Sequence, residues 1–85
     1  MEIIFAPKAL KDLSYWRKSG KIKIQKKITV LITAISDDPF SGIGMPELLK
    51  HEFAGCWSRR INQEHRIIYE VAGSTIEILS LKDHY

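Results

Sequence analysis

Two arginines in the C-terminal half of the chain are spaced so that they could bind an anion together. The runs 56–62 and 65–71 are rich in aromatic and β-branched residues and predict two neighbouring strands. A three-residue connection would place Arg60 directly opposite Arg66, whereas a two-residue connection would shift this pairing by one position. Arginines paired in this way repel each other unless an anion or a carboxylate lies between them. The pair marks either an anion site or two exposed rim residues, and Arg59 must point to the other face.

Further groups that could carry charge or transfer protons lie before and after these strands. Glu47 and Lys50 stand three residues apart where a loop passes into an extended segment. Such Glu–Lys pairs are common on protein surfaces, so the spacing by itself does not identify a catalytic acid or base. His84 and Tyr85 end the sequence directly after a predicted strand, so an imidazole and a phenol could be held close to the sheet instead of in a frayed tail.

Several catalytic chemistries do not fit the sequence. Cys56 is the only cysteine, which excludes an intramolecular disulfide and a zinc site built on two or four cysteines. No two of the three histidines are three or four residues apart, so the spacing of a histidine metal pair is missing. The glycines Gly42 and Gly44 do not lie between a strand and a helix, and no serine stands in a nucleophile elbow. We therefore expect neither a metal nor another cofactor.

A small number of helices and strands must position these residues. The predicted elements are a strand over 3–6, a helix from Pro7 to the stop signal Ser19-Gly20, a second helix that ends at 37–39, and strands over 56–62, 65–71 and 74–81. The apolar residues expected to be buried are Ala9, Leu10, Leu13 and Trp16 in the first helix and Ile24, Ile28, Leu31, Ile32 and Ile35 in the second. Two helices cannot bury both stripes against each other, so a sheet must cover them. The order β-α-α-β-β-β predicts an α+β fold, an antiparallel sheet with both helices packed on one face.

Length and charge limit the function classes. The 85 residues carry 13 Lys and Arg against 10 Asp and Glu, a formal net charge of +3, and suffice for a single domain over residues 1–85. The basic excess lies in the first 45 residues, mostly in the two predicted helices. It favours a polyanion or an acidic protein as partner, although a solvated helix surface has the same composition. Because no leader peptide and no apolar run of about 20 residues stands out, we expect a cytoplasmic protein that does not enter membranes.

Several segments taken together resemble one known family. They are Pro39-Phe40-Ser41-Gly42, Pro46-Glu47-Leu48-Leu49-Lys50-His51, Gly55-Cys56-Trp57-Ser58-Arg59-Arg60-Ile61, Glu64-His65-Arg66 and the terminal His84-Tyr85. This pattern resembles the YoeB (Txe) toxins, and the resemblance extends over residues 1–85. Members of that family are the toxins of bacterial type II toxin–antitoxin pairs, have the RelE-like fold and cut mRNA in the decoding site of the ribosome. The resemblance implies the same fold and the same activity here.

The resemblance also implies a complete catalytic set. The family's general base falls on Glu47, its phosphate-stabilising arginine on Arg66, its general acid on His84, and supporting roles fall on Lys50, Arg60 and Tyr85. These groups suit metal-independent cleavage of RNA, in which the ribose 2′-OH attacks the adjacent phosphate and leaves a 2′,3′-cyclic phosphate. One position departs from the family, because Met45 stands where a lysine commonly precedes the Pro-Glu pair. A positive charge beside the base is therefore missing.

The family further implies macromolecular partners. They are a YefM-like antitoxin, the 70S ribosome with its mRNA, and DNA only indirectly through the antitoxin, while a homodimer of the free toxin is compatible with the resemblance. An acidic antitoxin segment that folds along the basic helices would also stabilise so small a domain.

The sequence leaves two other functions open. A related toxin of the same fold that poisons DNA gyrase through protein contacts would not need His84 and Tyr85. A non-enzymatic RNA- or protein-binding module would use Arg60 and Arg66 to hold phosphate, and Glu47 would then be incidental. Deletion of the last two residues separates the nuclease from both alternatives, because only the nuclease depends on them.

Overall fold

A computed structural model describes residues 1–83, with the backbone only at Asp83. Its elements are β1 (Glu2–Phe5), α1 (Pro7–Ser19), α2 (Ile22–Asp37), β2 (Glu47–Leu48), the 3₁₀ turn η1 (His51–Phe53), β3 (Trp57–Arg60), β4 (Arg66–Ala72) and β5 (Thr75–Asp83). This order confirms the predicted strand, two helices and three-stranded meander. The expectations for His84 and Tyr85 fall outside the described residues.

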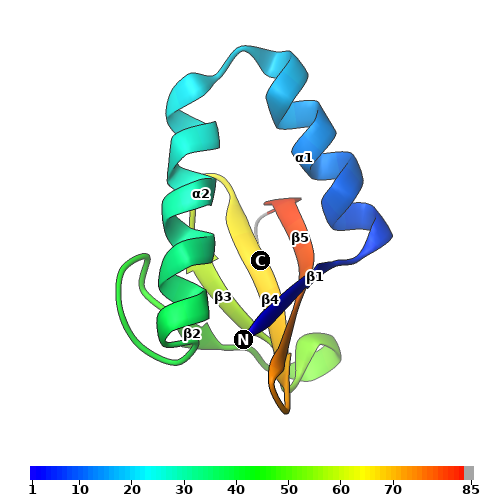
Figure 1. Cartoon of the computed structure of the whole chain (residues 1–85), viewed down its shortest axis with the longest axis vertical. Coiled ribbons are helices and arrows are strands. Elements are labelled where there is room, and N and C mark those ends of the chain that lie inside the picture. The colour runs from blue at the N-terminus through cyan, green and yellow to red at the C-terminus, as the bar shows by residue number, and fades with distance from the viewer. Residues whose placement is uncertain (84–85) are drawn as a thin grey trace.

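Five strands form one mixed sheet in the order β1-β5-β4-β3-β2 (Figure 1). The meander β3-β4-β5 is antiparallel, as predicted, and β2 adds a two-residue antiparallel strand at one edge. The predicted antiparallel sheet needs correction at the other edge, because β1 pairs parallel with β5, from Glu2↔Thr75 to Phe5↔Ile78. A parallel pair requires a long crossover, and the intervening chain with both helices supplies it.

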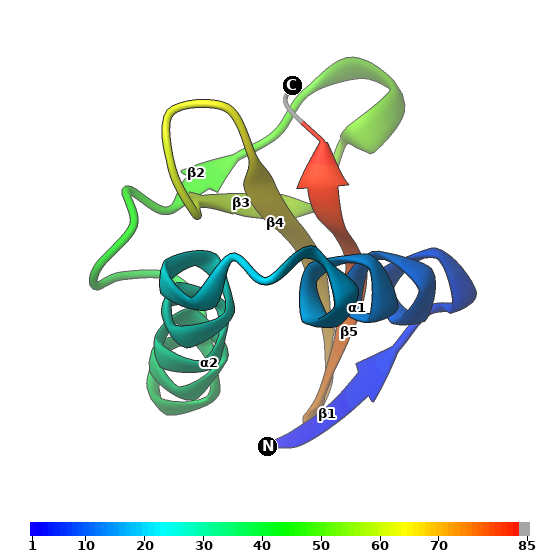
Figure 2. The same ribbon diagram turned by 90° about the horizontal axis from the view of Figure 1, so that it is seen from above.

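Both helices cover one side of the sheet, and the segment with η1 lies on the other side (Figure 2). α1 ends where predicted, since Gly20 adopts the left-handed conformation with φ 75°, and α2 ends at Asp37. The core between helices and sheet consists of Ala9, Trp16, Ile28, Leu31, Ile35, Ile61, Ile67, Tyr69, Ile76, Ile78 and Leu81. Within residues 1–83, neither helix has both the length and the apolar composition that crossing a membrane requires.

The buried face of α1 differs from the prediction at two positions. Leu10 is 53% exposed, whereas Asp12 is only 7% exposed. Asp12 lies one helical turn before Trp16 and shares its face toward the sheet, while Leu10 is turned to solvent. A carboxylate is tolerated inside because it accepts hydrogen bonds from the backbone N–H of Leu81 at 2.9 Å and from Lys8 Nζ at 2.7 Å.

Candidate functional site

Three of the predicted site residues line one cleft on the side of the sheet opposite the helices. The cleft has a volume of about 310 Å³ and is bordered by β2, the segment with η1 and the start of β4. It is lined by Glu47, Leu48, Leu49, Lys50, His51, Phe53 and Arg66. The fold therefore brings together Glu47, Lys50 and Arg66, to which the family resemblance assigns the general base, a supporting cation and the phosphate-stabilising arginine.

Glu47 and Arg66 approach each other in this cleft. Arg66 Nη1 lies 3.7 Å from Glu47 Oε2, and the two side chains are 18% and 63% exposed, respectively. An ion pair this exposed adds only about 0–1 kcal/mol to folding stability, so the pair contributes little to holding the fold. The arrangement keeps a proton acceptor open to solvent beside a planar donor whose geometry suits a phosphate.

The β3–β4 register surrounds Arg66 with further residues. It places Arg60 directly opposite Arg66, as the three-residue connection predicts. Ser58, two residues before Arg60 on the same face, accepts a hydrogen bond from Arg66 Nη1 at 3.4 Å. Arg60 is exposed and is not among the described residues that line the cleft. On the other side Arg66 pairs with Asp83, so β5 reaches this edge one residue before His84.

Sequence reasoning did not identify several residues that line the cleft or contact Arg66 beside it. His51 and Phe53 begin and end η1, and His51 has a left-handed φ of 60°. No spacing in the sequence pointed to them, because only the fold brings this turn next to β2. Ser58 could be inferred, since a register that pairs Arg60 with Arg66 puts Ser58 diagonally across from Arg66 on the same face.

A buried arginine organises the loop that leads to Glu47. Arg59 is fully buried, and because side chains alternate along a strand, it points to the face of β3 opposite that of Arg60. Its guanidinium donates hydrogen bonds to the backbone carbonyls of Asp38, Ser41 and Ile43 at 2.5, 3.0 and 3.1 Å. A buried charge needs hydrogen-bond partners. The loop supplies them as carbonyl groups, and it therefore folds around the guanidinium. The path of the chain into β2 is thereby set.

Gly44 lets the same loop approach β3 closely. Its φ is 84°, and a Cβ at this position would lie 2.7 Å from Leu31 Cδ2 and 3.1 Å from Arg59 Cβ. The Gly44 carbonyl accepts a hydrogen bond from the N–H of Arg60 at 2.7 Å. A larger residue would push the loop away from β3 and displace Glu47, which begins the next strand.

Tyr69→Phe is expected to destabilise the fold and loosen the loop before Glu47. The Tyr69 hydroxyl donates to the carbonyl of Pro39 at 2.6 Å and accepts from Arg59 Nε at 3.1 Å, and burial raises the pKa of the phenol. Without the hydroxyl, two buried groups lose a partner, which costs about 1–3 kcal/mol of unfolding free energy. Urea unfolding measures this loss, and Tyr15→Phe at an exposed phenol on α1 is the matched control. Equal stability of the two variants would contradict the role given to Tyr69.

Sequence comparison relates the chain over its full length to bacterial proteins named Toxin YoeB. A family model described as the YoeB-like toxin of bacterial type II toxin-antitoxin system matches residues 5–85. Toxin YoeB of Synechocystis sp. is 45% identical over 85 residues, which cover 100% of this chain and 98% of the relative. Toxin YoeB of Escherichia coli K12 is 41% identical over 85 residues, which cover both proteins completely.

Solved structures agree with the fold. The YoeB/ParE toxin from Agrobacterium tumefaciens has a TM-score of 0.94 at 37% identity, with 100% of both chains covered. YoeB from Staphylococcus aureus, in a heterotetrameric YoeB-YefM complex and as a dimer, has TM-scores of 0.88 and 0.90 at 42% identity, covering 100% of this chain and 98% of that chain. These likenesses confirm the predicted α+β arrangement with two helices on one face of the sheet. The chain belongs to the YoeB-like toxin family of bacterial type II toxin–antitoxin systems.

Proposed function

We propose that this toxin is a ribosome-dependent endoribonuclease that cuts mRNA and thereby inhibits translation. The observation that supports this best is the pair of Glu47 and Arg66, whose side chains approach to 3.7 Å. In RNA the attacking 2′-oxygen lies next to the phosphorus, so a base for the 2′-OH and a donor for the phosphate must also be neighbours. The pair meets this requirement in a cleft that is open to solvent.

The reaction needs two proton transfers and a stabilised phosphate. Glu47 takes the proton of the 2′-OH while this oxygen forms its bond to phosphorus. Arg66 donates hydrogen bonds to the phosphate oxygens, on which negative charge grows. His84 protonates the 5′-oxygen while its bond to phosphorus breaks. The products are a 2′,3′-cyclic phosphate and a free 5′-hydroxyl, and the atoms balance without a metal ion or a cofactor.

Three further side chains support this chemistry. Lys50 lines the same cleft as Glu47 and adds positive charge to it. Arg60, exposed opposite Arg66, suits the RNA backbone beside the scissile phosphate. Tyr85 either stacks on a base or hydrogen-bonds the phosphate. Because the substrate supplies the 2′-OH as nucleophile, RNA is cleaved and DNA is not.

The exposed basic residues of the helical region supply a second nucleic-acid surface. They are Lys8, Lys11, Arg17, Lys18, Lys21, Lys23 and Lys26. The helices lie on the opposite side of the sheet from the cleft, so the two surfaces are free to bind at once (Figure 2). We assign the helical surface to the phosphate backbone of ribosomal RNA on the cytoplasmic 70S ribosome, with binding that weakens as salt rises.

A YefM-like antitoxin is the partner that we propose to restrain the toxin. The Staphylococcus aureus relative occurs in a heterotetrameric complex with YefM, which supports this choice. An acidic antitoxin segment is complementary to the basic helices, and any contact with DNA is then made by the antitoxin. The dimer of the same relative supports a homodimeric free toxin.

Primer extension on mRNA recovered from translating ribosomes tests the nuclease. The wild-type chain should make discrete cuts within codons, and these cuts should disappear with Glu47→Ala, Arg66→Ala and His84→Ala. Growth arrest with intact mRNA would contradict the proposal and direct attention to gyrase or another protein target. Salt-dependent RNA binding without any cleavage would indicate a non-enzymatic binding module. Cuts that persist in the three variants would overturn the assigned site.

A further inference from the structure

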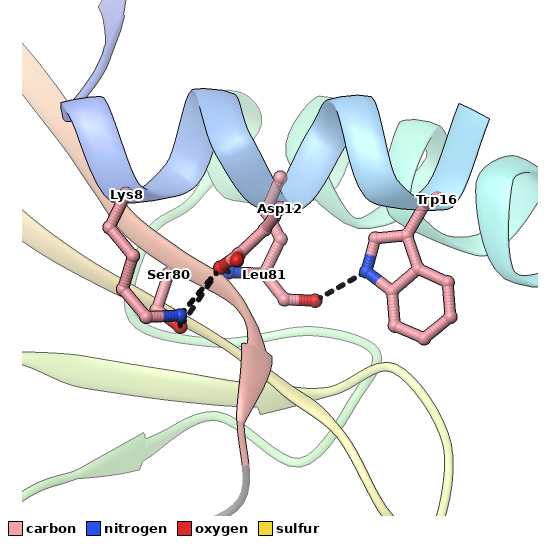
Figure 3. Close-up of polar contacts among 5 residues, drawn as sticks. All are labelled: Lys8, Asp12, Trp16, Ser80 and Leu81. Carbon is pink, nitrogen blue, oxygen red and sulfur yellow. Dashed lines mark hydrogen bonds and ion pairs between the residues drawn. The ribbon is translucent and has the colours of Figure 1, made fainter. Parts of the chain in front are cut away.

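Both backbone groups of Leu81 are bound by side chains of α1 (Figure 3). The N–H of Leu81 donates to Asp12 Oδ2 at 2.9 Å, and its carbonyl accepts from Trp16 Nε1 at 2.8 Å. Both side chains are buried, with exposed fractions of 7% for Asp12 and 1% for Trp16. An acceptor and a donor one helical turn apart therefore clamp a single residue of β5.

α1 occupies this place because the parallel partner of β5 ends early. β1 pairs with β5 only as far as Phe5↔Ile78, and a last bond runs from the N–H of Ala6 to the carbonyl of Ile78 at 2.9 Å. Beyond this point, residues 1–83 provide no further strand on that side of β5. Buried backbone groups at such an edge need partners, and Asp12 and Trp16 supply them.

The same stretch of β5 changes its register against β4. Between the pairs Ile68↔Ser80 and Arg66↔Asp83, β4 advances by two residues and β5 by three. A second shift lies between Tyr69↔Ile78 and Ile68↔Ser80, where β4 advances by one residue and β5 by two. β5 therefore carries two extra residues between Ile78 and Asp83, and bulges of this kind re-aim the side chains of a strand. In a register continued without shifts from Tyr69↔Ile78, Leu81 would lie opposite Arg66 in place of Asp83.

Lys8 and Ser80 also contact the carboxylate of Asp12. Lys8 Nζ donates to Asp12 Oδ2 at 2.7 Å and to Ser80 Oγ at 3.1 Å, and Ser80 Oγ lies 3.5 Å from the same carboxylate oxygen (Figure 3). Charge-assisted hydrogen bonds of this kind are short and directional. The carboxylate is thus fixed relative to Ser80, which lies between the two register shifts.

We propose that Asp12 and Trp16 are positioning residues that lock this bulged stretch of β5 and set the register in which the chain passes from Leu81 to His84. The proposal rests on the proposed function, in which His84 donates the proton to the leaving oxygen. Leu81 precedes His84 by three residues, and within residues 1–83 the pairing of β5 with β4 extends to Asp83. The clamp acts on the general acid through the backbone, from the side of the sheet opposite the cleft that holds Glu47 and Arg66.

Trp16→Phe tests the clamp, because it removes the N–H donor and keeps an aromatic ring. With saturating ribosomes, the rate of mRNA cleavage should fall about 10- to 100-fold. Trp57→Phe, the same change at the other tryptophan, is the matched control and should change the rate little. Asp12→Ala should reproduce the loss, and Asp12→Asn, which keeps an oxygen acceptor, should lose less.

A double-mutant cycle with His84→Ala separates positioning from general damage to the fold. If Trp16 acts through His84, then Trp16→Phe has no further effect on the residual cleavage of His84→Ala. A full additional loss in that background, or an unchanged rate of Trp16→Phe in the wild-type background, would overturn the proposal.

NMR follows the register without any need for cleavage. The wild-type chain should show a cross-strand nuclear Overhauser contact between Arg66 and Asp83, and Trp16→Phe should lose it while the contact between Tyr69 and Ile78 persists. Retention of the Arg66–Asp83 contact in Trp16→Phe would overturn the proposal. If the wild-type chain did not cleave mRNA and the contact were still lost in the variant, the proposed function would fall and the control of register by α1 would stand.

Discussion

Glu47→Gln is expected to lower the rate of mRNA cleavage on the ribosome by about 10²- to 10⁴-fold. The amide keeps the shape of the carboxylate and can still accept a hydrogen bond from the 2′-OH, but it cannot take up the proton. Single-turnover cleavage of ribosome-bound mRNA, followed by primer extension, measures the chemical step apart from binding. The loss should lie in the rate at saturation, while the half-saturating concentration of ribosomes stays unchanged.

The Glu47→Gln variant should fold like the wild type, because this side chain is 63% exposed and its ion pair with Arg66 adds little stability. A melting curve checks this. Glu70→Gln is the matched control, since Glu70 is exposed on β4 and alternates onto the same face as Arg66. Full activity of Glu47→Gln would contradict its role as base, and equal losses in both variants would indicate a general effect of charge on RNA binding.

The surroundings of Arg66 could be predicted from the sequence because short-range rules determine them. The length of the connection sets the β3–β4 register, and of the two pairings that the sequence allowed, the structure has the one with Arg60 opposite Arg66. Alternation along a strand sets the face, so Arg59 was expected to point away from Arg60, and it is buried while Arg60 is exposed. These local constraints do not depend on the rest of the fold.

The edges of the sheet could not be predicted in the same way. Local periodicity in residues 3–6 identifies a strand but carries no information about its partner, which lies at the other end of the chain and runs parallel. β2 has only two residues, too few for an alternating pattern to be recognised. The left-handed conformation of His51, which directs the chain around the cleft, has no glycine to mark it.

Leu10 and Asp12 show how topology can override hydrophobic periodicity. From their side-chain polarity, Leu10 is expected in the core and Asp12 at the surface, yet Leu10 is exposed and Asp12 is buried. The reason is the N–H of Leu81, which faces α1 where β1 has ended and is satisfied by the Asp12 carboxylate. Which backbone groups lack a strand partner is known only once the strand order is known, so the sequence pattern could not anticipate this burial.

Arg66→Lys is expected to lower the cleavage rate by about 10²- to 10³-fold, although the positive charge is kept. The guanidinium is a planar fork that can bind two phosphate oxygens at once, whereas the lysine ammonium is a point charge on a flexible stem. In the free protein this fork is already oriented, because Nη1 donates to Ser58 Oγ at 3.4 Å and lies 3.7 Å from Glu47 Oε2. Lysine would lose both the second hydrogen bond to the phosphate and this orientation.

Arg60→Lys separates the geometry of the fork from its charge, because it makes the same substitution at the residue directly opposite. Arg60 is exposed, so a role limited to charge predicts a much smaller loss than for Arg66→Lys. Single-turnover rates of the two variants, at two salt concentrations, give the comparison. Equally small losses would contradict the assignment of Arg66 as the phosphate donor and leave it a general cation. Equally large losses would mean that the two arginines, which repel each other in the free protein, bind the scissile phosphate as a pair.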